Sequence, residues 1–447
     1  MGTLLAAGLH SVLALATGVL VARTLGPEGK GAVTLVALVF SEFPLVLSLG
    51  VEIAVIYYGG RARYPLPTLA SAAMGLSLVL GATGTLAALA LFAFAFRQRI
   101  PAELTSVIVL MSCIIPLDLF TRILRNLARV SGRTVEERFL TALQTLLILL
   151  LVAVALWRGW GLPGALYGYG LGQIFSSGAV IILARRWGLV RSGPTFPVSL
   201  WKSLVGYGSR IHVGRLLQHL NYRLDTYMIT FFLGGASVGL YSVAVAMAEW
   251  LWIIPEVLGP ALMQRVATRS ELDANRFMPP LLRLTSTVLF LGVATWALAG
   301  SWVIRRLYGE AFSASYVPLL LLLPGIWSLG LWKSLMHDLS VRGYPIYLTW
   351  TSAVGVVLTV VLNLVLVPRW GIAGAAIASS VAYTAAFLTA LRLYGRVTKT
   401  TAAQLLVPRL ADFSDMLVRL RNLRGEAGRG AVATPAARVE VVESEGP

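Results

Sequence analysis

Residues 160–165 read Trp-Gly-Leu-Pro-Gly-Ala, and residues 370–375 read Trp-Gly-Ile-Ala-Gly-Ala, 210 positions later. One such match carries little weight, because glycine and other small residues are common in the turns of membrane proteins. Two further segments recur at nearly the same offset: Leu25-Gly26 with Gly31 as Leu233-Gly234 with Gly239, and, more weakly, Arg129-Val-Ser-Gly132 as Ser340-Val-Arg-Gly343. Three matches in the same order at a nearly constant offset indicate an internal duplication.

The composition is that of a membrane protein. Of 447 residues, 57% are hydrophobic and 13% are charged, and the mean hydropathy is +0.78. Soluble chains are about 45–50% apolar and about 25% charged. Apolar runs of about 20 residues, long enough to cross a bilayer, recur along the chain. They predict an all-α polytopic membrane protein with twelve transmembrane helices, at residues 2–22, 32–57, 68–96, 104–125, 139–157, 164–184, 205–232, 237–262, 281–303, 314–336, 346–367 and 371–391.

The duplication divides these spans into two halves of six. An even number of spans in each half makes the halves parallel repeats, related by an axis along the membrane normal, around a central cavity. We therefore predict four parts: an N-terminal six-helix lobe at 1–184, a cytoplasmic linker at 185–204, a C-terminal six-helix lobe at 205–391 and a cytoplasmic tail at 392–447. The tail pattern predicts an amphipathic helix on the inner leaflet at about 402–424, followed by disorder.

The distribution of basic residues predicts the orientation in the membrane. With the N-terminus inside, the inner loops hold 17 lysines and arginines and the outer loops hold 8. The positive-inside rule therefore favours cytoplasmic N- and C-termini in the cytoplasmic (inner) membrane. The net charge of +17 is explained by these loops, which contact membrane lipids, so we expect no nucleic-acid partner. The single cysteine, Cys113, excludes an intramolecular disulfide.

The seventh span carries charged residues inside an apolar run. A charge at the bilayer centre costs about 2.5–3.5 kcal/mol even on the lenient insertion scale, so such residues face a bundle interior or water. Helical spacing places five polar or charged side chains on one face: His212, Arg215, His219, Tyr222 and Arg223. We predict that Arg215, His219, Tyr222 and Arg223 line the cavity. Guanidinium groups bind phosphate oxygens in a bidentate manner, so the cargo would be anionic. The alternative is that Arg215 reaches the cytoplasmic edge while Arg223 pairs with a carboxylate for packing alone.

Four carboxylates in or near the spans are candidates for binding a coupling ion, H⁺ or Na⁺: Glu52, Asp225, Glu249 and Glu256. The alternative for each is a structural pairing with a neighbouring arginine. The two histidines of span seven, His212 and His219, lack a third ligand, so we predict no metal site. The sequence contains no phosphate-binding loop and no large outer loop, and we expect neither a catalytic residue nor a cofactor.

Four blocks of sequence resemble the polysaccharide transporter family, whose members are the O-antigen and lipid-linked oligosaccharide flippases of the MATE-like flippase superfamily. They occur in the same order as in that family and together cover much of the membrane region: residues 21–40, 231–262, 306–323 and 362–383. The resemblance implies a V-shaped pair of six-helix lobes (the MATE-like flippase fold) and alternating access. It also implies a cargo of sugars on a polyprenyl diphosphate, moved from the inner to the outer leaflet for surface polysaccharides such as O-antigen or exopolysaccharide. The family's cationic cavity adds Arg23 to the candidate substrate-binding residues.

Such a flippase would act beside a polysaccharide polymerase and glycosyltransferases. Two other functions stay open. An exporter of drugs or organic cations from the same superfamily would need an acidic or aromatic cavity, whereas span seven is basic. A membrane-embedded glycan polymerase or ligase would need charged residues clustered on the outer side, whereas the excess lies on the cytoplasmic side.

Overall fold

The computed structural model of the chain describes residues 2–96, 102–252, 255 and 271–407. The described residues form helices and connecting turns. The main helices are α1 (Gly2–Leu47), α2 (Val51–Gly60), α3 (Leu66–Leu91), α4 (Thr105–Val130), α5 (Thr134–Trp157), α6 (Gly161–Arg186), α7 (Val198–Leu233), α8 (Gly235–Glu249), α10 (Glu271–Leu307), α11 (Tyr316–Val341), α12 (Ile346–Thr398) and α13 (Ala402–Leu406).

Where the residues of a predicted span are described, they lie on helices, the second span running over α1 and α2; residues 253–254 and 256–262 of the eighth span lie outside the described residues. Among the described residues, eight helices are long and apolar enough to cross a membrane. Two of them, α1 and α12, each contain two spans, because the chain reverses direction inside them at Gly26 and Gly371. The charged α7 and the shorter α8 supply the remaining two spans, so the prediction of twelve transmembrane helices is confirmed.

The repeated glycines are the residues at which the chain turns. Gly26 has φ 66° and ψ −172°, and its counterpart Gly234 has φ 84° and ψ −175°. Gly161 and Gly371 likewise have φ values of 57° and 60°. Residues with a Cβ rarely adopt this region, so glycine is required where two antiparallel helices meet at so tight a turn. The duplication seen in the sequence is therefore a repeat of turn geometry.

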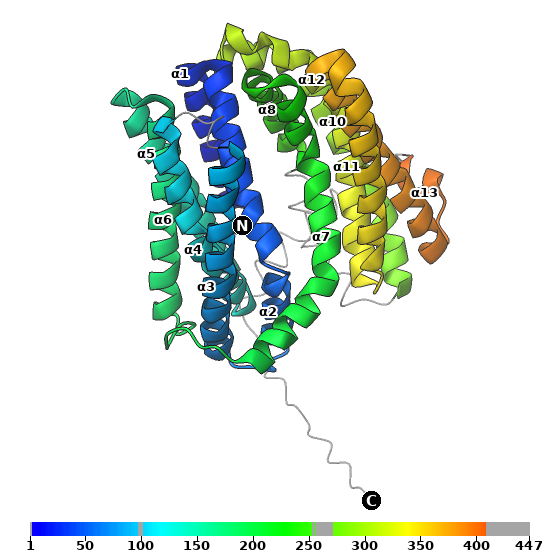
Figure 1. The fold of residues 1–447 in the computed structure, drawn as a ribbon. Helices are drawn as coiled ribbons and strands as arrows, with labels where there is room; N and C mark the ends of the chain where they lie inside the picture. Colours follow the sequence, from blue (N-terminus) through cyan, green and yellow to red (C-terminus); the bar gives the residue numbers. More distant parts are fainter. Residues whose placement is uncertain (1, 97–101, 253–254, 256–270, 408–447) are drawn as a thin grey trace, which may run out of the picture.

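The helices form two bundles side by side (Figure 1). The N-terminal lobe contains α1 to α6, and the C-terminal lobe contains α7 to α12. Each lobe has its own packed apolar core. Large apolar side chains also face outward, among them Trp157, Phe231 and Leu298, which are 82%, 81% and 87% exposed. Such a surface is expected for helices that face lipid rather than water.

The two lobes touch at both ends of the molecule. We call the end with Gly26 the outer end and the opposite end the inner end, after the predicted orientation. At the outer end, a Cβ added to Gly31 would overlap the carbonyl oxygen of Gly235, and a Cβ added to Gly239 would overlap that of Pro27. We call this contact the outer closure.

The inner closure joins α2 to α7. Cβ atoms added to Gly50 or Gly208 would each overlap the backbone of the other residue. Tyr57 lies seven residues after Gly50, and Tyr207 immediately precedes Gly208; their rings stack with centroids 4.1 Å apart. The structure therefore holds the lobes together above and below the space between them.

The tail begins with a short helix packed on the C-terminal lobe. Thr401 caps α13 and forms a capping box with Gln404. Leu405 is buried, and the carbonyl of Gln404 accepts a hydrogen bond from Arg283. The rest of the predicted amphipathic helix, and the predicted disorder after it, lie outside the described residues.

Candidate functional site

A cavity of about 530 Å³ lies between the two lobes, and we call it the central cavity. The second half of α1, with α4 and α6, supplies the wall on the N-terminal side, and α7 and α8 supply the wall on the C-terminal side. Its ionisable wall residues are Lys30, Glu42, Arg122, His219, Arg223 and Glu249. Two guanidinium groups, one lysine amine and two carboxylates therefore face the same space, with the imidazole of His219.

Helix α7 reaches other helices through three ion pairs, stacked along its length. Arg223 donates to Glu249 of α8, with Nη1 and Oε1 2.8 Å apart. His219 lies 2.7 Å from Glu42 of α1, and Arg215 lies 3.9 Å from Glu52 of α2. The last two pairs join the two lobes, because α1 and α2 belong to the N-terminal lobe.

These pairs show that the charged face predicted on span seven also contacts carboxylates of other helices. Arg223 and His219 do line the central cavity. Glu249, proposed from the sequence as a separate ion-binding group, is the partner of Arg223, and Glu52 is the partner of Arg215. The face is a row of base–acid pairs, and the opposite wall adds Lys30 and Arg122, of which Arg122 is also paired, with Asp118.

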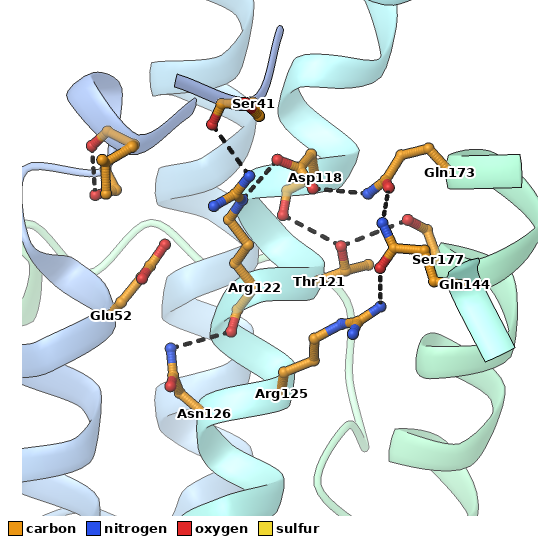
Figure 2. Close-up of polar contacts among 12 residues, drawn as sticks. Ser41, Glu52, Asp118, Thr121, Arg122, Arg125, Asn126, Gln144, Gln173 and Ser177 are labelled. Carbon is orange, nitrogen blue, oxygen red and sulfur yellow. Dashed lines mark hydrogen bonds and ion pairs between the residues drawn. The ribbon is translucent and has the colours of Figure 1, made fainter. Parts of the chain in front are cut away.

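Arg122 belongs to a polar network inside the N-terminal lobe (Figure 2). Its Nε donates to Asp118 across 2.6 Å, one turn earlier on α4, and its Nη2 donates to the carbonyl of Ser41 across 3.2 Å. The other carboxylate oxygen of Asp118 accepts from Gln173 across 2.7 Å. Gln173 in turn contacts Gln144. The guanidinium of Arg122 is thus held in one orientation at the border between the lobe and the cavity.

Tyr222 and Asp225 lie within the C-terminal lobe. The ring of Tyr222 packs 5.0 Å from that of Trp252, and the ammonium of Lys333 sits over both rings. The carboxylate of Asp225 is buried and accepts hydrogen bonds from Tyr241 and from Ser379. A buried carboxylate with this many donors is well solvated by the protein. Neither residue is part of the wall of the central cavity.

Two other candidates lie elsewhere. Arg23 is exposed at the outer end, where its guanidinium donates to the carbonyls of Arg306 and Leu307 at the end of α10. It therefore joins the lobes above the cavity. Glu256 lies outside the described residues.

Sequence reasoning missed Glu42, Lys30 and Arg122 as cavity residues. Arg122 was visible only as one half of a pair with Asp118, four residues earlier. Lys30 lies between the first two predicted spans, so hydropathy assigns it to an outer loop and not to the cavity. A single signal could have indicated Glu42: an isolated acid in an apolar span is costly unless it has a basic partner.

Within the described ranges, no three His, Cys, Asp or Glu residues gather as a set of metal ligands. The central cavity instead offers guanidinium, ammonium and imidazole groups held next to carboxylates. Such groups bind an anion by exchanging a carboxylate for a phosphate.

Several solved structures share this architecture. The lipid II flippase MurJ, in an inward closed conformation, is 12% identical with a TM-score of 0.71, and the match covers 96% of this chain and 93% of that one. The MATE transporter VcmN from Vibrio cholerae is 15% identical with a TM-score of 0.61, covering 90% and 96% of the two chains. A multidrug resistance MATE family transporter of the MOP superfamily, in an outward-facing conformation, is 17% identical with a TM-score of 0.58. The match covers 89% of this chain and 95% of that one.

At these identities the likeness shows the fold. A comparison with curated proteins gives no match. The family model described as polysaccharide biosynthesis protein matches residues 2–264, more than half of the chain. The chain is thus a multi-pass membrane protein with the twelve-helix fold of the MOP superfamily, and it belongs to the polysaccharide biosynthesis protein family.

Proposed function

We propose that this protein is a flippase that moves an oligosaccharide linked to a polyprenyl diphosphate across the membrane. The observation that carries the proposal is the central cavity, enclosed between two lobes and lined by the guanidinium groups of Arg122 and Arg223 and the amine of Lys30. Family membership supports a role in polysaccharide synthesis. A diphosphate headgroup is the anionic part of such a lipid, and no bond need be made or broken to move it.

The pair of Arg223 and Glu249 is the group that would hold the diphosphate. Its two side chains are 29% and 23% exposed, so both are open to the cavity. A phosphate can replace the carboxylate because it accepts two parallel hydrogen bonds from a guanidinium. Arg122 faces the same space from the other lobe and would bind the second phosphate. The cargo would then contact both lobes at once.

Movement would follow from opening one closure at a time. Both closures include close backbone contact at glycines. Apolar side chains also cross them, because Ala22 of α1 packs in the core of the C-terminal lobe and Leu200 and Leu204 of α7 pack in that of the N-terminal lobe. Opening a closure would therefore expose these side chains. With the outer closure formed and the inner one open, the cavity would accept the lipid from the inner leaflet, and the reverse state would release it to the outer leaflet.

Glu52 is our proposed coupling group. Its Oε1 is buried with no hydrogen-bond partner among the described residues, and its Oε2 lies 3.9 Å from Arg215. A buried carboxylate oxygen without a hydrogen-bond partner is stabilised when it binds a proton or a sodium ion. The Glu52→Gln variant should flip at a rate that no longer responds to an imposed ion gradient. Testing pH and sodium gradients separately identifies the ion.

The proposal places the protein in the cytoplasmic membrane with both termini inside. Glycosyltransferases would supply its cargo there, and a polymerase would use the cargo on the other side.

The direct test is a sidedness assay in proteoliposomes. A polyprenyl-diphosphate oligosaccharide is incorporated in both leaflets, and a membrane-impermeant glycosidase reports the fraction that becomes accessible with time. Wild-type protein should expose the inner pool, and Arg223→Gln should do so at least about 10-fold more slowly, because a charged hydrogen-bonded group contributes about 1.5–3 kcal/mol. An inner pool that stays protected with wild-type protein contradicts the proposal.

One observation favours a second function, export of organic cations. Two carboxylates, Glu42 and Glu249, line the central cavity, and two of the similar folds belong to MATE transporters. If this function held, the same proteoliposomes would accumulate a lipophilic cation such as ethidium against its gradient. Each of the two carboxylates already has a basic partner, which favours the flippase.

A further inference from the structure

A second cavity, of about 230 Å³, opens inside the N-terminal lobe, and we call it the side pocket. It adjoins the central cavity, since Ser41, Arg122 and Tyr169 line both. Its remaining polar wall consists of Asp118, Gln144 and Gln173, the residues of the network in Figure 2. None of these side chains takes part in the ion pairs of α7.

The charges of the side pocket disfavour a cation. Both oxygens of Asp118 are already occupied, one by Arg122 at 2.6 Å and the other by Gln173 at 2.7 Å. Behind them, Arg125 donates to Gln144 across 2.7 Å. Neither oxygen of the carboxylate is left without a donor, so Asp118 is already bound on both sides. A sodium ion at this place would have to displace Arg122 or Gln173.

The groups that remain suit a ligand rich in hydroxyls. The carbonyl oxygens of Gln144 and Gln173 each accept one hydrogen bond already, from Arg125 and from Gln144. Because an amide oxygen has two lone pairs and an amide nitrogen two hydrogens, Gln173 still has one acceptor and one donor position for a ligand. The hydroxyl of Tyr169 has no hydrogen-bond partner within the part of the chain that the structure describes, although it borders both cavities. Opposite this polar wall lie apolar side chains, among them Phe40 and Met111. A sugar ring presents hydroxyls at its edge and C–H groups on its faces, which matches such a pocket.

The size and position of the pocket indicate which sugar it would hold. Sites for drug-sized ligands have volumes of about 300–1,000 Å³, so a pocket of about 230 Å³ suits a single ring. Arg122 stands between the side pocket and the central cavity. A phosphate on Arg122 therefore places the group directly attached to it at the pocket mouth.

We propose that the side pocket is the subsite for the first sugar, the one joined directly to the diphosphate, and that Tyr169 and Gln173 bind its hydroxyls. This inference rests on the proposed function, because it assigns the diphosphate to the central cavity. It makes the protein selective for the first sugar, whereas the sugars further along the chain would lie outside the pocket.

Two probes test the inference: polyprenyl diphosphate without sugar, and polyprenyl diphosphate bearing one N-acetylhexosamine. Dissociation constants are measured on the full chain in detergent. Wild type should bind the sugar-bearing probe more tightly. Tyr169→Phe removes one neutral hydrogen bond and should weaken that probe about 3- to 10-fold, with the sugar-free probe changed less than about 2-fold. Tyr167→Phe is the matched control: it removes a hydroxyl from the same helix at a residue that borders neither cavity.

Gln173→Leu is the second variant and should act in the same direction as Tyr169→Phe. Equal weakening of both probes would overturn the inference, because the pocket would then serve the phosphates. So would equal affinity of wild type for the two probes, which leaves the proposed function intact. If wild type binds neither probe, the proposed function fails and the inference fails with it. A changed sodium or proton dependence of flipping, with unaltered affinity for both probes, would assign the pocket to a coupling ion instead.

Discussion

The outer and inner closures are built from the same backbone contact but are secured in different ways. At both ends, glycines of the two lobes meet with no room for a Cβ. At the outer end, the added support is one guanidinium, that of Arg23, bound to main-chain carbonyls. At the inner end, the support comes from side chains on both lobes: the stacked Tyr57 and Tyr207 and the pair of Arg215 with Glu52.

The difference indicates which parts of each closure can be adjusted by the cargo or an ion. Backbone packing at glycines is insensitive to charge, so the outer closure responds mainly to the position of the helices. The inner closure contains an ion pair 3.9 Å long whose arginine is 43% exposed. Half-exposed pairs contribute little stability, so protonating Glu52 or binding an anion nearby would loosen this end at small cost. The inner closure is accordingly the one we expect to be regulated.

The largest effect is expected from blocking the outer closure with Gly239→Ala. The new methyl group would overlap the carbonyl oxygen of Pro27, and overpacking of this kind costs about 1–3 kcal/mol. Flipping should fall at least about 10-fold. In a Cys113→Ser background, a cysteine at Ser242 in the cavity should react faster with an impermeant maleimide added at the outer side.

Gly235→Ala is the matched control, because its Cβ would meet only a carbonyl oxygen 4.0 Å away. If Gly235→Ala slows flipping as much as Gly239→Ala does, helix propensity rather than backbone contact explains the effect.

The equivalent change at the inner end is Gly208→Ala. Its methyl group would overlap the backbone of Gly50, so the inner closure would form less completely. We expect a reduction in flipping of about 5- to 10-fold. The effect is smaller than at the outer end because the tyrosine stack and the Arg215–Glu52 pair of the inner closure still draw the lobes together. The cysteine at Ser242 should now react faster from the inner side. Gly206→Ala, which has open space around it, should behave like wild type.

The tyrosine stack should have a smaller effect. Tyr207→Ala removes the ring that packs on Tyr57, and an aromatic pair contributes about 0.5–1.5 kcal/mol beyond its buried area. Labelling of the cavity from the inner side should rise about 3-fold. Tyr207→Phe keeps the ring and should not differ from wild type. Equal effects of the two variants would show that the hydroxyl, and not the stack, matters.

The smallest effect is expected for Arg23→Gln. This change weakens the hydrogen bonds to the carbonyls of Arg306 and Leu307, but the site is exposed and water can replace them. Labelling from the outer side should rise about 2-fold. A reduction in flipping as large as that of Arg223→Gln would instead place Arg23 among the residues that bind the cargo.

The fold could be predicted from the sequence because its determinants are local. Apolar runs gave the spans, and the repeated Leu-Gly pairs marked positions where only glycine fits, such as Gly26 and Gly234. Hydropathy could not show that Gly31 and Gly239 hold the two lobes together. That contact joins positions about 208 residues apart, and a small residue in a membrane helix has several possible uses.

The candidate site was less accessible from the sequence. The basic face of α7 could be read from its helical periodicity, since those residues are close together along the chain. Their partners could not, because Glu42 and Glu52 lie far away in the sequence and reach α7 only when the lobes assemble. The neighbours of Tyr222 were hidden for the same reason: its position on the wheel adjoins Arg223, but Trp252 of the turn after α8, Lys333 of α11 and Tyr383 of α12 pack around it.

The measurement that tests alternating closure most directly is a pair of spin-label distances in the Cys113→Ser background. Trp160 and Trp370, equivalent residues of the two repeats, report the outer end, and Glu136 and Tyr344 report the inner end; all four are exposed and are replaced by labelled cysteines. In liposomes with the diphosphate lipid, we predict two populations in which one distance lengthens as the other shortens. Two distances that stay constant, or that lengthen together, would contradict the account.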